Sequence, residues 1–114
     1  MIQSEGNAGP MEAGWHKVAR KSALGEGEVT GAVIGDRQVA VYLLDGEIYA
    51  TDNICTHAYA CLSDGYLEDG IIECPLHAGR FEVKTGKALG SPVTKDIETF
   101  PVKLDGDDVL VKLG

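Results

Sequence analysis

Two short cysteine–histidine pairs constrain this chain more than any other feature of its sequence. Cys55 and His57 form the first pair, and Cys74 and His77 form the second, with residues 58–73 between them. Thiolates bind soft or borderline metal ions, and imidazoles suit the same ions, so four such ligands predict one inorganic centre. The fold must then bring two separate loops to face each other.

Two kinds of centre fit these ligands. A tetrahedral zinc ion and a two-iron, two-sulfur cluster can each take four ligands of these types. Structural zinc sites commonly use a pair of cysteines and a pair of histidines, whereas both pairs here are mixed. Two facing mixed pairs can supply two sulfurs to one iron and two nitrogens to the other, so the spacing favours the cluster. A mononuclear zinc ion in the same ligands is the alternative.

The composition limits the classes to which the chain can belong. Its 114 residues suffice for one domain with a modest core, and 44% hydrophobic with 25% charged residues is typical of a soluble globular protein. No apolar run reaches the ~20 residues of a membrane helix. Three cysteines without an export signal favour reduced thiols and a cytoplasmic location over a disulfide framework.

Acidic residues outnumber basic ones by 18 to 10, giving a formal charge of −8. This balance disfavours nucleic acid and anionic membranes as partners. No lysine or arginine lies between Arg37 and Arg80. The acidic residues of this interval are Asp45, Glu47, Asp52, Asp64, Glu68, Asp69 and Glu73. The acidic segment either keeps the surface soluble or docks a basic partner.

Short β-rich runs between turn signals predict an all-β fold. We expect strands over Trp15–Lys21, Glu28–Ile34, Gln38–Leu44, Glu47–Thr51, Tyr66–Glu68, Ile71–Cys74, Arg80–Lys84, Ile97–Leu104 and Val109–Leu113. Asp45-Gly46 and Asp69-Gly70 have the chemistry of hairpin turns. The regular alternation stops at Asp52-Asn53, just before the first ligand pair. No helical periodicity is sustained over three turns.

The same pattern predicts the organisation of the chain. We expect residues 1–14 to be a flexible N-terminal arm and residues 15–114 to be a single domain. Within it, residues 15–51 and 93–114 should form a basal antiparallel sandwich or barrel. Residues 52–92 should form a smaller inserted lobe with a ligand pair at each of two hairpin-like tips.

Other residues near the ligand pairs have expected roles outside the ligand set. Tyr59, Tyr66 and Phe81 are expected to shield the centre or to fill the core of the small lobe. Cys61 has no evident partner in the sequence and is expected to be a small buried hydrophobic residue rather than a ligand.

With these two motifs the chain resembles the Rieske family, whose members carry Cys-x-His and, after a similar interval, Cys-x-x-His. The resemblance covers nearly the whole chain and implies a basal β-domain with a cluster-binding insert. It also implies that Cys55 and Cys74 bind the inner iron of a [2Fe-2S] cluster. By the same resemblance His57 and His77 bind the outer iron and reach the solvent.

The resemblance sets an expectation for the reduction potential. Two neutral imidazoles in place of thiolates raise it to about −150 to +300 mV, against about −400 mV for plant-type ferredoxins. High-potential relatives add a disulfide between the loops and a serine two places after the second histidine. Leu76 and Gly79 occupy the positions of the second added cysteine and of that serine. Fewer donors to the sulfurs predict a potential at the low end of the range.

The small size of the chain argues against an enzyme. Oxygenases that combine this cluster with catalysis add a mononuclear iron held by two histidines and a carboxylate. Apart from His57 and His77 the chain has only His16, and it has no Gly-x-Gly-x-x-Gly sequence for a flavin or nicotinamide. The remaining role is that of a one-electron carrier.

The stretch from Cys55 to Phe81, followed by Thr85-Gly86, is similar to the ferredoxin components of bacterial aromatic-ring-hydroxylating dioxygenase systems. The resemblance implies transient contacts with an NAD(P)H-dependent flavoprotein reductase and with a terminal oxygenase. Such a carrier must dock with both partners through nearly the same face, around His57 and His77, so we expect a monomer that presents this face freely. A redox-sensing or regulatory Rieske subunit of another oxidoreductase is the alternative function.

Overall fold

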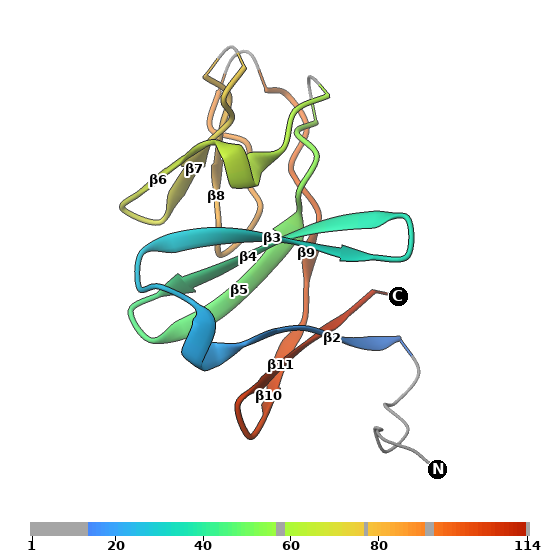
Figure 1. Cartoon of the computed structure of the whole chain (residues 1–114). Coiled ribbons are helices and arrows are strands. Elements are labelled where there is room, and N and C mark those ends of the chain that lie inside the picture. The colour runs from blue at the N-terminus through green and yellow to red at the C-terminus, as the bar shows by residue number, and fades with distance from the viewer. Residues whose placement is uncertain (1–13, 57–58, 77, 91–92, 114) are drawn as a thin grey trace.

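A computed structural model of the protein describes residues 14–56, 59–76, 78–90 and 93–113. The elements are β2 (Trp15–Arg20), η1 (Lys21–Ala23), β3 (Glu28–Ile34), β4 (Arg37–Leu44), β5 (Glu47–Asp52), η2 (Leu62–Asp64), β6 (Tyr66–Glu68), β7 (Ile71–Glu73), β8 (Arg80–Glu82), β9 (Thr99–Phe100), β10 (Val102–Asp105) and β11 (Asp108–Lys112) (Figure 1). The all-β prediction is confirmed. Apart from Gly14, the expected N-terminal arm lies outside the described residues.

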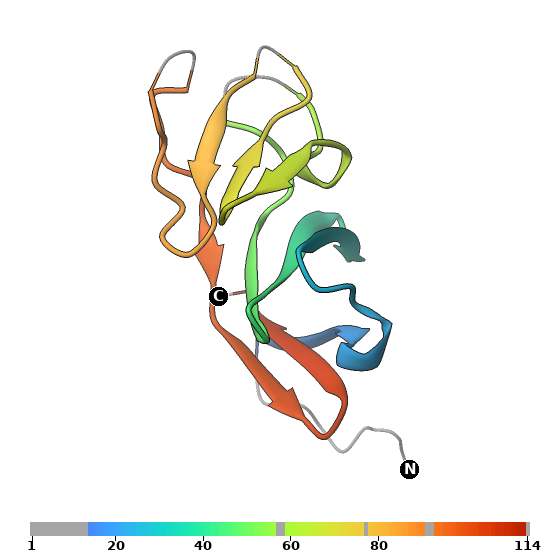
Figure 2. The same ribbon diagram turned by 90° about the vertical axis from the view of Figure 1, so that its left-hand side faces the viewer.

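The strands form three antiparallel sheets, with the orders β10-β11-β2, β3-β4-β5-β9 and β6-β7-β8. The sheet β6-β7-β8 lies at one end of the molecule, the sheet β10-β11-β2 at the other, and the four-stranded sheet between them (Figures 1 and 2). Because β2 pairs with β11, the first and last strands of the described chain lie in one sheet. None of the described helices is of the length and apolarity that a bilayer crossing requires.

Two hairpin turns form where the sequence predicts them. Asp45 and Gly46 have φ values of 53° and 80°, and Asp69 and Gly70 have 55° and 76°. Positive φ at both central residues is the type I′ geometry that matches the twist of paired strands. The Glu26 carboxylate supports the first turn by accepting the N–H groups of Asp45 at 2.6 Å and Gly46 at 3.0 Å.

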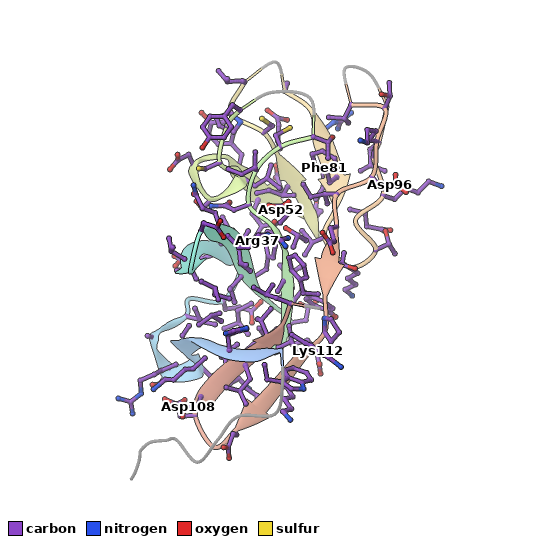
Figure 3. The ribbon with its side chains drawn as sticks, turned by 90° about the vertical axis from the view of Figure 1, so that its right-hand side faces the viewer. Arg37, Asp52, Phe81, Asp96, Asp108 and Lys112 are labelled. Carbon is purple, nitrogen blue, oxygen red and sulfur yellow. The ribbon has the colours of Figure 1, made fainter. Side chains whose placement is uncertain are left out.

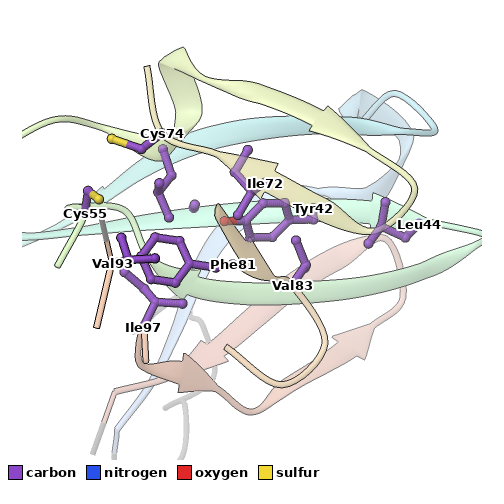
Figure 4. Packing of buried hydrophobic residues seen from close by; sticks show 11 residues of the cluster. Tyr42, Leu44, Cys55, Ile72, Cys74, Phe81, Val83, Val93 and Ile97 are labelled. Atoms are coloured by element: carbon purple, nitrogen blue, oxygen red, sulfur yellow. The ribbon is translucent and has the colours of Figure 1, made fainter. Parts of the chain in front are cut away.

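The central strand β4 divides the interior into two cores. Its residues 39–44 are all buried, as expected of a continuous apolar run covered on both faces. One face of β4 contributes to the upper core, which comprises Ala40, Tyr42, Leu44, Cys55, Leu62, Ile72, Cys74, Phe81, Val83, Val93 and Ile97 (Figure 4). The other face contributes to the lower core, which comprises Val39, Val41, Ala50, Phe100, Val109 and Val111. Cys55 and Cys74, the two predicted cysteine ligands, both belong to the upper core.

The prediction of one continuous strand over Ile97–Leu104 is wrong. The segment forms two short strands separated by Pro101, with β9 pairing with β5 and β10 pairing with β11. Proline has no N–H for a ladder, so the chain changes sheets at this residue. The predicted strands Ile71–Cys74 and Arg80–Lys84 also end early, at Glu73 and Glu82.

Candidate metal centre

The structure brings the two predicted cysteine ligands together at the end of the molecule formed by β6, β7 and β8. Cys55 and Cys74 are 5% and 1% exposed. Their sulfurs lie above Val93 and Phe81 at the edge of the upper core (Figure 4). All three cysteines of the chain are described, and none forms a disulfide. The two predicted histidine ligands, His57 and His77, lie outside the described residues.

The two cysteines begin loops that close in the same way. In the first ligand loop, residues 54–61, the N–H of Cys55 donates to the carbonyl of Ala60 at 2.9 Å. In the second ligand loop, residues 74–79, the N–H of Cys74 donates to the carbonyl of Gly79 at 2.6 Å. Each cysteine is therefore hydrogen-bonded to the residue five positions later, which closes the base of its loop. Both loops begin at the same end of the molecule.

The thiols of Cys55 and Cys74 interact with each other, and this affects the pKa of Cys74. Burial raises the pKa of the Cys74 thiol, and hydrogen bonding with the adjacent Cys55 thiol raises it further, while the N–H of Leu76 acts in the opposite direction. Two thiolates this close repel each other unless a cation lies beside them, and a metal ion deprotonates coordinating thiols. The pair therefore suits a thiolate-bound metal centre.

Within the described residues no group of three or more histidine, cysteine or acidic side chains could hold a metal ion. The predicted set needs both histidines, which fall outside that part of the chain. The observation that bears on the fit is the pair of buried sulfurs in mutual contact. This donor chemistry fits one half of a cluster with two sulfur and two nitrogen ligands.

An apolar floor lies beneath the thiols. Leu62, Ile72 and Phe81 are fully buried there, and Phe81 fills the core as predicted. Figure 3 places Phe81 and Asp96 toward the end of the molecule that carries the sulfur atoms, whereas Asp108 lies toward the opposite end. The floor excludes water from the inner side of the centre.

Tyr59 and Tyr66 do not fill the core of the small lobe, because these side chains are 85% and 68% exposed. That they shield the centre stays a prediction. The prediction for Cys61 is also only partly right. This residue is half-buried and has a partner, since its thiol donates to Gln38 Oε1 at 3.4 Å.

A third segment of the chain flanks the first ligand loop. The hydroxyl of Thr56 donates to the carbonyl of Lys95 at 3.0 Å. Val93 is buried in the upper core, and the Asp96 carboxylate accepts the N–H of Ala88 at 2.9 Å. These contacts hold residues 93–97 against the ligand-bearing end.

Two carboxylates of the acidic segment and two from outside it gather on a flank of the molecule, below the ligand loops. A hollow of about 380 Å³ lies between the β4–β5 turn and the β6–β7 turn. It is lined by Lys84 and by the carboxylates of Glu26, Asp45, Asp69 and Glu82. A second hollow, of about 190 Å³, lies beside Tyr66 and Glu73. A negative flank of this kind can orient a basic partner over a distance.

Sequence reasoning missed Asn53, which is 2% exposed and lies two residues before Cys55. Thr51, Asn53 and Cys55 are all buried, whereas Asp52 and Ile54 between them are only partly covered. The signal in the sequence was that every second residue continues to face inward past the end of β5. It could not be separated from a solvent-facing turn, because Asn and Asp are common turn residues.

Comparisons with known proteins agree with this geometry. The family described as Rieske [2Fe-2S] domain matches residues 14–101. The ferredoxin component of the naphthalene 1,2-dioxygenase/salicylate 5-hydroxylase systems of Ralstonia sp. is 50% identical over 103 residues, which cover 90% of this chain and 99% of that protein.

Two solved structures have a similar fold. The Sphingomonas yanoikuyae B1 ferredoxin superimposes with a TM-score of 0.82 and 36% identity, over 87% of this chain and 98% of that one. A chain from the complex of reduced oxygenase and oxidized ferredoxin in carbazole 1,9a-dioxygenase also has a TM-score of 0.82 and 36% identity, over 89% of this chain and 94% of that one.

Proposed function

Because the chain belongs to the family of Rieske [2Fe-2S] domains, we propose that it carries single electrons to the terminal oxygenase of an aromatic-ring-hydroxylating dioxygenase system. The observation that carries the proposal is the pair of buried, mutually contacting thiols in a chain that spans nearly the full length of a ferredoxin relative. The protein is then an electron-transfer component and not an enzyme.

Cys55 and Cys74 would hold one [2Fe-2S] cluster, and His57 and His77 would complete its ligand set. When bound, the cluster accepts and releases one electron at a time. Residues 52–92 form the cluster-binding subdomain, and residues 15–51 and 93–114 form the basal β-domain. The separate sheet β6-β7-β8, whose strands all lie within residues 52–92, supports this division. The upper core joins the two parts, since it connects β4 to the floor beneath the thiols.

The residues around the ligand loops supply a docking face. Tyr59 is 85% exposed in the first loop, and Leu76 is 46% exposed in the second. Tyr59 follows His57 by two residues and Leu76 precedes His77 directly. Transient redox complexes are small, and an exposed aromatic side chain near the centre of such a contact supplies much of its binding energy. Both side chains would contact the partner.

The partners are a terminal oxygenase and an NAD(P)H-dependent flavoprotein reductase, each bound transiently by a monomer in the cytoplasm. The carbazole dioxygenase complex, in which a similar chain accompanies an oxygenase, supports the first partner. The proposal of a reductase partner rests on the family resemblance. The carboxylates of the acidic flank would raise association rates with a basic partner, and this effect would fade with added salt.

The test is single-turnover electron transfer. The purified protein is reduced anaerobically and mixed with the terminal oxygenase of a naphthalene dioxygenase system, and its reoxidation is followed by absorbance. Rapid reoxidation, with product formed only when reductase, this protein and oxygenase are all present, supports the proposal. A reduced protein that the oxygenase does not reoxidise contradicts it and favours the redox-sensing or regulatory alternative.

The docking face has its own matched test. Tyr59→Ala and Leu76→Ala should slow reoxidation without changing the electron paramagnetic resonance spectrum. Tyr66→Ala removes a similarly exposed tyrosine from β6 and should leave the rate unchanged. Colour and electron paramagnetic resonance test the zinc alternative. A zinc protein would be colourless and would give no resonance signal after dithionite, because zinc has no redox chemistry.

A further inference from the structure

Among the described residues two polar side chains are buried, and both lie just before the first ligand cysteine. Thr51 is fully buried and Asn53 is 2% exposed. Together with Cys55 they occupy alternate positions on the inward side of the chain. Burying an amide or a hydroxyl costs free energy unless its hydrogen bonds are replaced, so each of these groups needs partners.

The hydroxyl of Thr51 makes its hydrogen bonds within the four-stranded sheet. It donates to the carbonyl of Asp52 at 2.8 Å, so the Tyr42 hydroxyl, 2.8 Å away, is the donor to Thr51. Burial raises the pKa of Tyr42, which keeps its hydroxyl protonated for this role. This chain of hydrogen bonds ends within the four-stranded sheet.

Asn53 makes a different set of contacts, which reach across the first ligand loop. Its Oδ1 accepts the N–H of Ser63 at 2.8 Å, and its Nδ2 donates to Ser63 Oγ at 3.0 Å. Its own N–H donates to the carbonyl of Gln38 at 3.0 Å, and its carbonyl accepts the N–H of Leu62 at 2.7 Å. The amide orientation follows from the contacts, because a backbone N–H can bond only to the oxygen.

These contacts join the two ends of the first ligand loop. Asn53 precedes the loop, while Leu62 and Ser63 follow it in η2. The backbone of the loop contributes one isolated bridge, between Ile54 and Cys61. Its two hydrogen bonds run from the N–H of Cys55 to the carbonyl of Ala60 and from the N–H of Leu62 to the carbonyl of Asn53. The side chain of Asn53 therefore fastens the base of the loop that presents Cys55.

Gly31 on β3 provides the space for this arrangement. A Cβ atom at residue 31 would lie 2.9 Å from Ser63 Oγ and 3.3 Å from Asn53 Nδ2. Contacts this short would force Ser63 or Asn53 to move. The absence of a side chain at residue 31 lets β3 pack directly against the Asn53–Ser63 pair.

We propose that Asn53 is the positioning residue of the first ligand loop. Through its paired hydrogen bonds to Ser63, against Gly31, it sets the position of Cys55 and so how firmly the protein holds its cluster. The inference rests on the proposed function, because it takes Cys55 to be a ligand. Groups that orient metal ligands typically change metal affinity by about 10- to 100-fold when removed.

The experiment compares graded variants of the loaded protein. Asn53→Ala removes both side-chain hydrogen bonds to Ser63, and Ser63→Ala removes only the one from Nδ2. Val111→Ala is the control, since it truncates a fully buried side chain in the lower core. Cluster release to excess EDTA is followed by loss of visible absorbance, and the g values of the reduced protein are recorded in parallel.

Asn53→Ala should release its cluster about 10- to 100-fold faster than the original protein, with Ser63→Ala between them. Its g values should shift, because the position of a ligand changes. Val111→Ala should lower the melting temperature and leave the g values unchanged. The inference is overturned if Asn53→Ala and Ser63→Ala both release the cluster at the rate of the unsubstituted protein and have its g values.

Gly31→Ala gives an independent test that leaves both polar side chains in place. It should speed cluster release, while Thr30→Ala, at the neighbouring exposed position of β3, should not. If Asn53→Ala does not fold, equal release from the Gly31 and Thr30 variants overturns the inference. A failure of the proposed function looks different, because the original protein would then contain no acid-labile sulfide.

Discussion

The two ligand loops reach the same closure by different means. In each, the N–H of the cysteine donates to a carbonyl five residues later, that of Ala60 or of Gly79. The second loop joins β7 to β8. These two strands are paired up to Glu73 and Arg80, so their ladder holds both ends of the loop. The first loop leaves the end of β5, and its two ends are joined by a single bridge between Ile54 and Cys61.

The difference shows where side chains must replace a ladder. A hairpin loop takes its position from the paired backbone of its strands, and the second ligand loop has no need of a buried polar side chain. The first loop lies beyond the last paired residue of β5, so the buried amide of Asn53 performs the same task. Fully satisfied buried polar groups of this kind specify one arrangement of a loop.

Replacing either ligand cysteine tests whether the two loops are equivalent as ligand donors, and it should have the strongest consequence of all the changes. Cys55→Ser and Cys74→Ser should each abolish cluster binding, because a serine oxygen is a poor ligand for iron that prefers thiolates. Cys61→Ser should retain the cluster. Visible absorbance and acid-labile sulfide measure the outcome, and a cluster retained in either ligand variant would break the symmetry proposed here.

The next effect concerns how the second loop is supported. Phe81 is fully buried on β8 beneath this loop. Phe81→Ala should destabilise the protein by about 3–5 kcal/mol, the usual cost of removing a buried aromatic side chain. Urea unfolding measures the change, with Val33→Ala at a 72% exposed position as the control. A loss below about 1 kcal/mol would show that packing does not hold this loop.

The two loops also differ in the hydrogen-bond donors that they can offer to the cluster, which affects the reduction potential. A redox titration followed by electron paramagnetic resonance should place the midpoint at the low end of the −150 to +300 mV range. Gly79→Ser adds a donor in the second loop and should raise it by roughly 20–60 mV, the equivalent of one net hydrogen bond for a one-electron couple. A midpoint well above zero in the original protein would contradict the reasoning.

The smallest effect lies far from both loops, in the β10–β11 turn. Hydrogen bonds from the Ser22 hydroxyl and N–H, with Arg20, lower the pKa of Asp107. A carboxyl whose pKa is lower in the folded state stabilises the fold above its unfolded pKa, and that contribution is lost as the pH falls through the folded pKa. Asp107→Asn should therefore lower stability slightly at neutral pH and flatten its decline in acid.

Thermal unfolding between neutral and acidic pH measures this change, and Asp105→Asn in the same hairpin serves as the control. The cluster spectrum should be the same in both variants. An unchanged acid profile in Asp107→Asn would show that its hydrogen bonds to Ser22 add nothing to stability.

Local patterns account for what could be predicted of the fold. The bounds of β3 and β6 match the predictions, and the turns at Asp45-Gly46 and Asp69-Gly70 form as expected. These features depend on a few adjacent residues, since only certain residues tolerate positive φ and alternation is a property of one strand. The failure at Pro101 is of another kind, because the choice between two sheets depends on strands far away in the sequence.

The cysteine–histidine motifs were enough to predict the chemistry of the centre. The spacing of the cysteine–histidine pairs identified the family and named four candidate ligands, because ligand type and spacing within a short loop are local properties. The tertiary structure decided that Cys55 and Cys74 meet in one buried corner. It also decided that Asn53 holds the first loop, because its burial requires β3, β4 and η2 to converge, and no local pattern encodes contacts between such distant segments.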